Sequence, residues 1–267
     1  MSKLEKTLVA VGRLQDGDCS ICERYDARSL LITTVAYMVL MLSVPAVDVG
    51  TLLLMGIYPV VAAALNSQNY GRFFLRSLWV LPLVVLIGFA NPLEDKEVAF
   101  HVGTAGVSGG WISFAGIILR GLLSMQALLI LLHSAGFRGV VGAMRSLGMP
   151  VWMTTQLLMV MRYISVLMEE ALSMQRAREA RGFGRRSLPL KMWGVMIGQL
   201  FIRSVERSER IARAMSARGF SGTMPEYKKR ERRLTSGDIL YPAVWTALFC
   251  LIRFTHVAAW LGHHMAV

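Results

Sequence analysis

Two copies of one short phrase carry the side chains best suited to binding a partner. The chain reads Arg-Ala-Arg-Glu-Ala-Arg-Gly-Phe at 176–183 and Arg-Ala-Met-Ser-Ala-Arg-Gly-Phe at 213–220. Each copy ends a charged segment with helical patterning, where arginine suits the negative end of the helix dipole and glycine can adopt the left-handed conformation that terminates helices. A guanidinium at a helix tip can make bidentate contacts with carboxylates in a partner's cleft. The alternative is two ordinary helix ends capped by glycine.

The other reactive side chains form no comparable constellation. The five histidines show no His-x-x-x-His spacing and no Cys/His cluster, so we expect packing or interfacial roles for them and no metal site. Cys19 and Cys22 form half of a zinc motif without its other half, and Cys250 in an apolar run is expected to be a core thiol. Arg120 and Arg253 also lie within apolar runs, where a structural and a functional role are equally open. No Gly-x-x-x-x-Gly-Lys-Ser/Thr phosphate loop occurs, so the chain is not itself an ATPase.

Composition indicates a membrane protein. Hydrophobic residues make up 54% of the 267 residues and charged residues only 17%. A formal net charge of +12 would raise nucleic-acid binding for a soluble protein. Here the basic residues are confined to particular loops and include no groove-reading motif, so membrane topology explains them better than a nucleic-acid partner. Residues 1–28 are polar and charged, so we expect no cleaved signal peptide.

Five apolar segments are predicted to cross the bilayer. Basic residues precede the first segment, are absent between the first and second, and return between the second and third. After the third segment only Lys96 stands among acidic residues, followed by a glycine-rich, turn-like stretch at 103–110, whereas basic residues are dense from 138 to 233. By the positive-inside rule this alternation predicts a cytoplasmic N-terminus, a cytoplasmic basic block and an external C-terminus. The predicted segments are 29–47, 49–71 with a kink at Tyr58-Pro59, 77–93, 111–133 and 239 to about 265.

The basic block is predicted to contain amphipathic helices. Its first part, 146–161, is uncharged but contains a glycine and a proline, so a surface helix and a sixth crossing fit it about equally. Further on, an apolar segment at 192–202 is too short to span a bilayer, and Glu206 can pair with Arg210 one helical turn later. Two amphipathic helices joined by a short apolar one would bury their apolar stripes against each other, the membrane or a partner. The stripes are Val160, Tyr163, Leu167, Ala171 and Met174, and then Val205, Ile211, Ala212 and Met215.

These features together resemble the transmembrane T component of energy-coupling-factor (ECF) transporters, the CbiQ/EcfT family. The resemblance rests on the two Ala-Arg-Gly motifs at the ends of cytoplasmic helices, after four hydrophobic segments and before a final one. Asp26-Ala27-Arg28 before the first segment and Asp238 at the start of the last one support it. The sequences at 78–82 (Leu-Trp-Val-Leu-Pro) and 91–93 (Asn-Pro-Leu) are most similar to the cobalt-transport CbiQ branch.

Composition and resemblance together imply an all-α polytopic membrane protein with about five transmembrane helices and a cytoplasmic coupling-helix domain. We expect a cytoplasmic tail (1–28), a four-helix membrane core (29–134), cytoplasmic coupling helices (135–237) and a final transmembrane helix (238–267). In the family, the T component joins two ABC-type ATPase subunits to a substrate-binding membrane subunit. That subunit would be CbiM-like in the cobalt branch, with or without a CbiN-like small subunit. The implied location is the cytoplasmic membrane of a bacterium or archaeon.

The resemblance also assigns roles to residues of the repeated motif. Each arginine would enter a groove on one ATPase, and its small neighbours would let the helix tip fit closely. The chain itself would be non-catalytic, without cofactor or metal, and would transmit the ATP-driven motion of its partners for cobalt uptake, which feeds cobalamin biosynthesis. The residues expected to dock the ATPases are Ala180, Arg181, Gly182, Ala217, Arg218 and Gly219.

Other functions remain open from the residues alone. The same scaffold serving nickel or vitamin uptake is the first alternative. A stand-alone membrane enzyme would need clustered titratable groups facing one cavity, and few such groups are visible in the apolar segments. A secondary transporter usually shows internal hydropathy repeats, and the odd number of spans and the large basic insertion argue against it.

Overall fold

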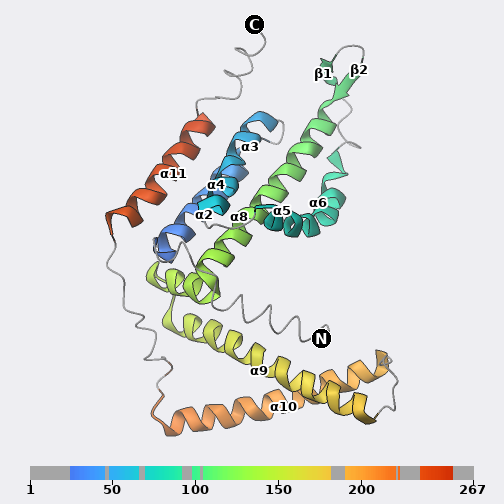
Figure 1. Ribbon diagram of the computed structural model, residues 1–267, viewed down its shortest axis with the longest axis vertical. Coiled ribbons are helices and arrows are strands. Elements are labelled where there is room, and N and C mark those ends of the chain that lie inside the picture. The colour runs from blue at the N-terminus through green and yellow to red at the C-terminus, as the bar shows by residue number, and fades with distance from the viewer. Residues whose placement is uncertain are drawn as a thin grey trace. The chain divides into compact units, whose positions relative to one another are not determined.

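In the computed structural model, the described residues form helices and one small β-hairpin (Figure 1). The structure describes residues 25–45, 48–65, 70–91, 98–102, 105–181, 190–220, 222 and 235–254. These residues divide into two compact units. The membrane unit contains the described residues up to Gly136 together with 235–254, and the helix-pair unit contains those from Phe137 to 222. The helical architecture confirms the predicted fold class.

The membrane unit is built from apolar helices that are interrupted near proline or glycine. A turn at Gly56 separates the second predicted segment into two helices, one turn before Pro59. Pro59 lacks the N–H that would bond to the carbonyl of Met55, so the ladder breaks there and not at the predicted Tyr58-Pro59 step. The elements of this unit are α2 (Ala27–Ser43), α3 (Val49–Met55), α4 (Ile57–Leu65), α5 (Tyr70–Ser77), the 3₁₀ turn η1 (Leu78–Val80), α6 (Leu81–Gly88), β1 (Val98–Val102), β2 (Ala105–Ser108), α8 (Gly109–Ser146) as far as Gly136, and α11 (Ser236–Phe254).

Two further boundaries differ from the prediction. The third segment begins earlier than expected, because α5 starts at Tyr70 and leads through η1 into α6. The 3₁₀ turn η1 lies just before Pro82, because proline has no N–H with which to donate a hydrogen bond to the carbonyl of Leu78. The stretch at 103–110 was expected to be a turn, but β2 lies within it and pairs antiparallel with β1, with Val102 opposite Ala105, and α8 already begins at Gly109.

A sharp break divides α8 at Gly136. Its backbone has φ 62° and ψ 164°, a combination that lies outside the helical region. A side chain at such a positive φ would be strained, so glycine suits this position. The helix therefore continues past His133, where the sequence predicted its end, and resumes after Gly136 as a second short helix to Ser146. The break coincides with the boundary between the two compact units.

An aromatic cluster forms the centre of the membrane unit. Tyr37 of α2 is fully buried, and its ring centroid lies 4.7 Å from that of Tyr58 in α4 and 5.2 Å from that of Phe249 in α11. Trp245 adds a fourth ring, 5.0 Å from Tyr58. Ring pairs at these separations stabilise packing beyond the apolar area that they bury. The cluster therefore ties three helices that are distant in sequence into one core.

The helix-pair unit is dominated by two long helices, α9 (Val151–Arg181) and α10 (Leu190–Ala217). The sequence suggested a separate short apolar helix at 192–202, but this segment is the first half of α10, which continues without a break. Gly194 and Gly198 within it stay helical, since glycine lowers helix stability without preventing the fold. The last part of α8 leads into this helix pair. Gly148, which follows α8, has a φ of 107°, the left-handed conformation of a glycine that caps a helix.

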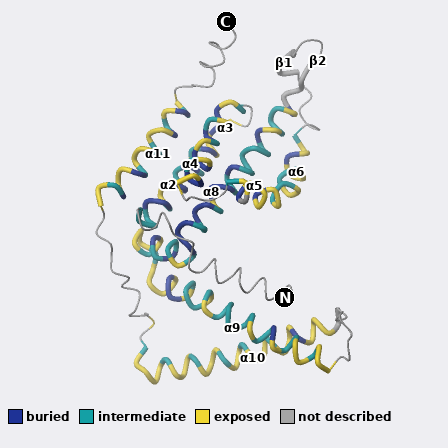
Figure 2. The backbone as a smooth tube through the Cα atoms, in the orientation of Figure 1, coloured by how far each residue is buried: buried dark blue, intermediate teal, exposed yellow. Residues whose placement is uncertain are grey.

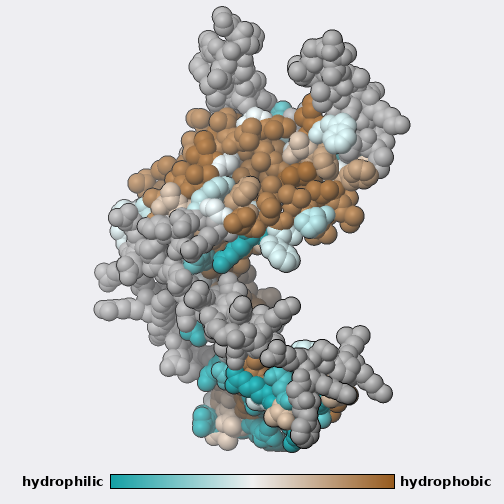
Figure 3. Space-filling view, turned by 45° about the vertical axis from the view of Figure 1, so that its right-hand side comes forward, coloured by the Kyte–Doolittle hydropathy of each residue, from teal (hydrophilic) through white to brown (hydrophobic). Residues whose placement is uncertain are grey.

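Three described helices are long and apolar enough to cross a membrane: Gly110–Ser146, Val151–Arg181 and Ser236–Phe254. Shorter apolar helices span Ala27–Ser43, Val49–Leu65 and Phe73–Gly88. Figure 3 shows hydrophobic side chains over most of the visible described surface of the membrane unit, while hydrophilic ones gather over the α9–α10 pair. Helices surrounded by lipid expose apolar side chains, and the surface of the membrane unit has this property.

Candidate functional site: the arginine-tipped helix pair

The end of α10 places Arg218 on a glycine-capped tip. The Phe220 N–H donates to the carbonyl of Met215 at 3.0 Å, and the Gly219 N–H donates to that of Ser216 at 3.0 Å. This pair of bonds, with φ 76° at Gly219, is the Schellman motif that closes helices with a left-handed glycine. The predicted glycine cap is thus confirmed for the second copy of the repeat. Arg218 and its neighbour Ala217 are exposed, and an added Cβ at Gly219 would meet no atom within 4 Å.

The first copy of the repeat also lies at a helix end. Arg181 is the last residue of α9, and both Arg181 and Ala180 are exposed. Gly182 lies outside the described residues. Within the part of the chain that the structure describes, neither Arg181 nor Arg218 forms an ion pair or a side-chain hydrogen bond. Both guanidinium groups are therefore presented to solvent at helix ends.

The two arginines lie at opposite ends of an antiparallel helix pair. Arg178 of α9 donates to the sulfur of Met192 at the start of α10, at 3.5 Å, and Glu170 contacts Arg203 and Arg207 further along. Because α10 runs back along α9, its C-terminal tip points away from that of α9, and Figure 1 shows the two helices crossing. At a rise of about 1.5 Å per residue, Arg181 lies about 16 Å beyond Glu170 in one direction. Arg218 lies a similar distance beyond Arg207 in the other.

Glu170 forms two ion pairs between the helices at their crossing. One carboxylate oxygen lies 3.3 Å from Arg203 Nη1 and the other 3.1 Å from Arg207 Nη2. The Glu170 side chain is only 15% exposed, so this contact is better shielded than the other ion pairs of α10. The predicted Glu206–Arg210 pair is also present, at 3.9 Å, but it joins residues of a single helix.

The apolar stripes predicted from the sequence meet in a groove between α9 and α10. The groove has a volume of about 550 Å³. Val160 and Val205 were predicted to belong to these stripes, but they do not line the groove and are exposed instead. The stripe residues that line it are Tyr163 and Leu167 from α9 and Ile211, Ala212 and Met215 from α10.

The first half of α10 exposes a large apolar surface. Ile197, Phe201 and Ile202 are each about 60% exposed or more, and Figure 2 shows α10 as mostly exposed along its length. On α9, Trp152 is 67% exposed. A surface that exposes several large aromatic and aliphatic side chains is typical of a contact with another protein or with lipid.

The two arginines within apolar runs share one structural contact. Arg120 of α8 donates to the carbonyl of Val44, and Arg253 of α11 donates to that of Ser43 at 3.1 Å. The last carbonyls of α2 lack partners within their own helix, and cationic side chains are favoured at that end of the dipole. The structure therefore places both arginines as caps on α2, where the sequence left their role open.

A buried carboxylate links the N-terminal ends of α2 and α11. Asp238 is 4% exposed and accepts the N–H of Asp26 at 2.8 Å and that of Thr235 at 2.9 Å. The second bond is half of a capping box at the start of α11. The two sequence features that flanked the apolar segments, Asp26 and Asp238, are thus in direct contact.

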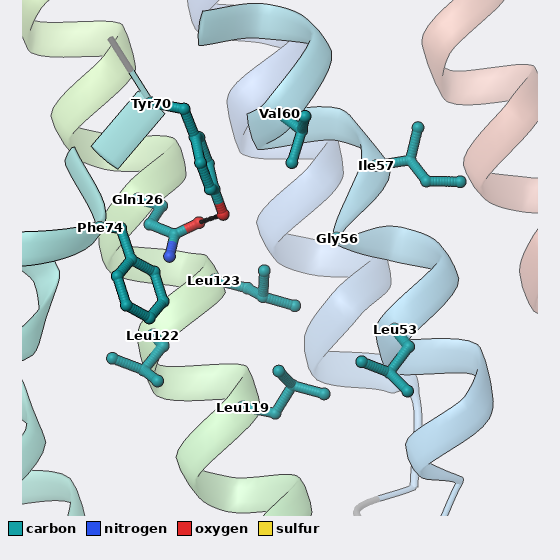
Figure 4. Close-up of a pocket in the computed structure, with 10 residues that line it drawn as sticks. All are labelled: Leu53, Gly56, Ile57, Val60, Tyr70, Phe74, Leu119, Leu122, Leu123 and Gln126. Carbon is teal, nitrogen blue, oxygen red and sulfur yellow. Dashed lines mark hydrogen bonds between the residues drawn. The ribbon is translucent and has the colours of Figure 1, made fainter. Parts of the chain in front are cut away.

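The membrane unit contains a second cavity, of about 400 Å³, between α3, α4, α5 and α8 (Figure 4). Its lining is aliphatic and aromatic apart from one polar contact, in which the Tyr70 hydroxyl donates to Gln126 Oε1 at 2.8 Å. No acidic, basic or histidine side chain lines it. A cavity of this kind offers neither metal ligands nor an acid–base pair.

Of the remaining candidate groups, His133 and Cys250 belong to the membrane unit. No group of three or more histidine, cysteine, aspartate or glutamate side chains that could hold a metal occurs among the described residues. His133 packs against Phe73, with ring centroids 5.5 Å apart, and Cys250 is a half-buried free thiol. Three histidines, at 256, 263 and 264, and the predicted half zinc motif of Cys19 and Cys22 lie outside the described residues.

Sequence reasoning missed Glu170, although a signal for it was present. Glu170 follows Leu167 by three residues and precedes Met174 by four, so it falls on the apolar stripe of α9. An acidic group on a buried face requires a cationic partner. Which arginine supplies that partner depends on the path of α10, which the stripe does not reveal.

Comparisons with known proteins agree with this architecture. The sequence profile of the CbiQ family, described as cobalt transport protein, matches residues 19–228. The energy-coupling factor transporter transmembrane protein EcfT of Bacillus subtilis is 26% identical over 253 residues, which cover 88% of this chain and 94% of that protein. EcfT of Lactococcus lactis is 28% identical over 251 residues, which cover 86% of this chain and 91% of that protein. EcfT of Acidaminococcus fermentans is 25% identical over 275 residues, which cover 93% of this chain and 97% of that protein. The chain is therefore a multi-pass membrane protein of the CbiQ/EcfT family, the transmembrane T components of energy-coupling-factor transporters.

Proposed function

We propose that this chain couples two ABC-type ATPase subunits to a substrate-binding membrane subunit through the tips of α9 and α10. The observation that carries the proposal is the pair of exposed arginines, Arg181 and Arg218, at opposite ends of the crossed helices. Two equivalent cationic tips that point in opposite directions suit two similar partners, one at each end. The chain has no phosphate loop of its own, so the energy would come from those partners.

The chemistry of each tip supports docking into an acidic cleft. A guanidinium group is planar and always charged, and it can donate two parallel hydrogen bonds to one carboxylate. The open space around Gly219 lets a partner approach the backbone closely. We assign the docking role to Arg181 and Arg218, with Ala180, Gly182, Ala217 and Gly219 as the small residues around them.

We further propose that the substrate is cobalt ion and that a CbiM-like subunit, with or without a CbiN-like one, binds it. Support comes from the description of the matching family as cobalt transport protein and from the sequences at 78–82 and 91–93. The names of the EcfT relatives specify no substrate. Nickel or vitamin uptake through the same scaffold is the alternative, and direct uptake assays with each substrate separate the two.

The distribution of charge supports the proposed orientation in the cytoplasmic membrane. Basic residues are dense from 138 to 233, the region that contains both arginine tips. The positive-inside rule places such a region in the cytoplasm, on the side where ATP and the ATPases are found. We therefore propose that the N-terminus and the region 135–237 face the cytoplasm, with membrane-embedded segments at 29–134 and 238–267.

Co-purification tests the docking role. The tagged chain is expressed with the ATPase subunits of its source organism, and capture is compared among wild type, Arg181→Glu, Arg218→Glu and the double variant. A charge-assisted hydrogen-bonded contact is worth about 1.5–3 kcal/mol, so each single reversal is expected to weaken capture about tenfold to a hundredfold. The double variant is expected to abolish it.

Arg213→Glu is the matched control, because it reverses an exposed charge about one turn before the tip of α10. Arg213 forms a 3.9 Å pair with Glu209 of its own helix, and its loss is expected to leave capture unchanged. Normal capture by a folded Arg181→Glu/Arg218→Glu double variant would show that the motifs are helix caps alone.

A further inference from the structure

Glu170 stands out among the titratable groups of the helix-pair unit because it contacts the partner helix twice. Its two carboxylate oxygens lie 3.3 Å and 3.1 Å from Arg203 and Arg207, which are one helical turn apart on α10. The other described ion pairs of α10 join Glu206 to Arg210 and Glu209 to Arg213, within the same helix. Among these described pairs, the contact between α9 and α10 is thus made by one shielded carboxylate.

The surroundings of Glu170 differ on its two sides. On one side the groove of about 550 Å³ separates the first half of α9 from the second half of α10, and Arg207 lines this groove as well as binding Glu170. On the other side Arg178 approaches Met192. A fixed contact next to unfilled space allows the helix ends to change their separation while the crossing point stays in place. Methionine side chains in the groove, at 159 and 215, can repack during such a change.

We infer that Glu170 is a positioning residue that fixes the crossing point of α9 and α10, so that a displacement at the Arg181 tip is transmitted to the Arg218 tip as a rotation about this point. The inference rests on the proposed function for its biological meaning. The crossing itself is a property of this chain, and it can be measured without any partner.

The distance across the crossing tests the inference. Spin labels are attached at Ala177→Cys and Ala214→Cys, two exposed positions on opposite sides of Glu170, in the full chain with its three native cysteines replaced by alanine. From the rise per residue the labelled backbones are about 25 Å apart along the pair, which suits pulsed dipolar spectroscopy. The purified chain in detergent is expected to give one narrow distance distribution.

Matched variants isolate the double ion pair. Glu170→Gln is expected to broaden the distribution, and Glu170→Arg, which gathers three guanidinium groups, is expected to broaden and shift it further. Glu206→Gln removes the same kind of group from a pair within one helix and is expected to change nothing. The exchange Glu170→Arg with Arg207→Glu restores opposite charges at the crossing and is expected to recover the narrow distribution. Helix content by circular dichroism verifies that each variant is folded.

Unchanged distributions in both Glu170 variants would overturn the inference, as would equal broadening in Glu206→Gln or a failed rescue by the charge exchange. A second readout uses the complex with the ATPase subunits, where Mg²⁺-ATP is expected to shift the Ala177–Ala214 label distance in wild type. Glu170→Gln is expected to retain capture of the ATPases but lose this shift. If the ATPases are not captured at all, the proposed function fails, while the measurement on the isolated chain still decides the role of Glu170.

Discussion

Replacing Asp238 by alanine is expected to destabilise the membrane unit substantially. The buried carboxylate accepts backbone N–H groups from Asp26, at 2.8 Å, and from Thr235, at 2.9 Å, and thereby joins the starts of α2 and α11. A hydrogen bond to a charged group is worth about 1.5–3 kcal/mol. Both N–H groups are only partly buried, so water replaces some of the loss, and we expect a decrease of about 2–4 kcal/mol in the free energy of unfolding. Asp238→Asn keeps one acceptor oxygen and is expected to lose about half as much.

The assay is equilibrium unfolding of the purified chain in mixed micelles of dodecylmaltoside and increasing sodium dodecylsulfate, followed by far-ultraviolet circular dichroism. Asp48→Ala is the matched control, since Asp48 is also an acidic residue at a helix start, before α3, but forms no side-chain capping bond. Its replacement is expected to change the free energy of unfolding by less than about 0.5 kcal/mol. The difference between the two variants isolates the bond between helices from a general dipole effect. Indistinguishable unfolding curves for Asp238→Ala and Asp48→Ala would refute the reasoning.

Two glycine substitutions test the backbone and packing of α8. Gly136→Ala places a side chain at φ 62° and is expected to lower the free energy of unfolding by about 1–2 kcal/mol. Gly198→Ala, in the exposed and regular part of α10, is expected to be neutral or to raise it by up to about 1 kcal/mol. The same unfolding assay compares the two variants, and equal effects would contradict the assigned break at Gly136. Gly121→Ala would bring its Cβ within 2.8 Å of Val84 Cγ2 and is expected to cost about 1–3 kcal/mol. Adding Val84→Ala is expected to recover part of that loss, and strict additivity of the two changes would argue against the close approach of α6 and α8.

Much of the fold class was predictable because its signals are local. Long uncharged runs predict membrane helices, and the Arg-Gly endings of the repeat predict glycine-capped tips, a prediction that Gly219 confirms for the second copy. The Glu206–Arg210 pair was also predictable, since its two members lie one turn apart on one helix. The docking role of the tips stays a prediction, because it concerns a partner outside this chain.

The errors in element boundaries have a shared physical cause. Hydropathy measures how apolar a segment is and does not report where its hydrogen-bond ladder breaks. The break at Gly56 precedes the predicted Tyr58-Pro59 kink because a missing N–H affects the carbonyl one turn earlier. The apolar segment at 192–202 predicts a separate helix because its composition differs from that of the charged residues that follow, although the backbone of α10 continues through both.

By itself, the sequence determined the membrane character of this protein, its helical class, and the pair of arginine-glycine helix ends, because each depends on residues that are neighbours along the chain. The tertiary structure alone decided which distant groups meet. It placed Glu170 against Arg203 and Arg207, Arg120 and Arg253 on the last carbonyls of α2, and Asp238 against the Asp26 N–H. Such pairings depend on how helices pack side by side, and a periodic apolar stripe shows that a helix face is buried without showing which helix covers it.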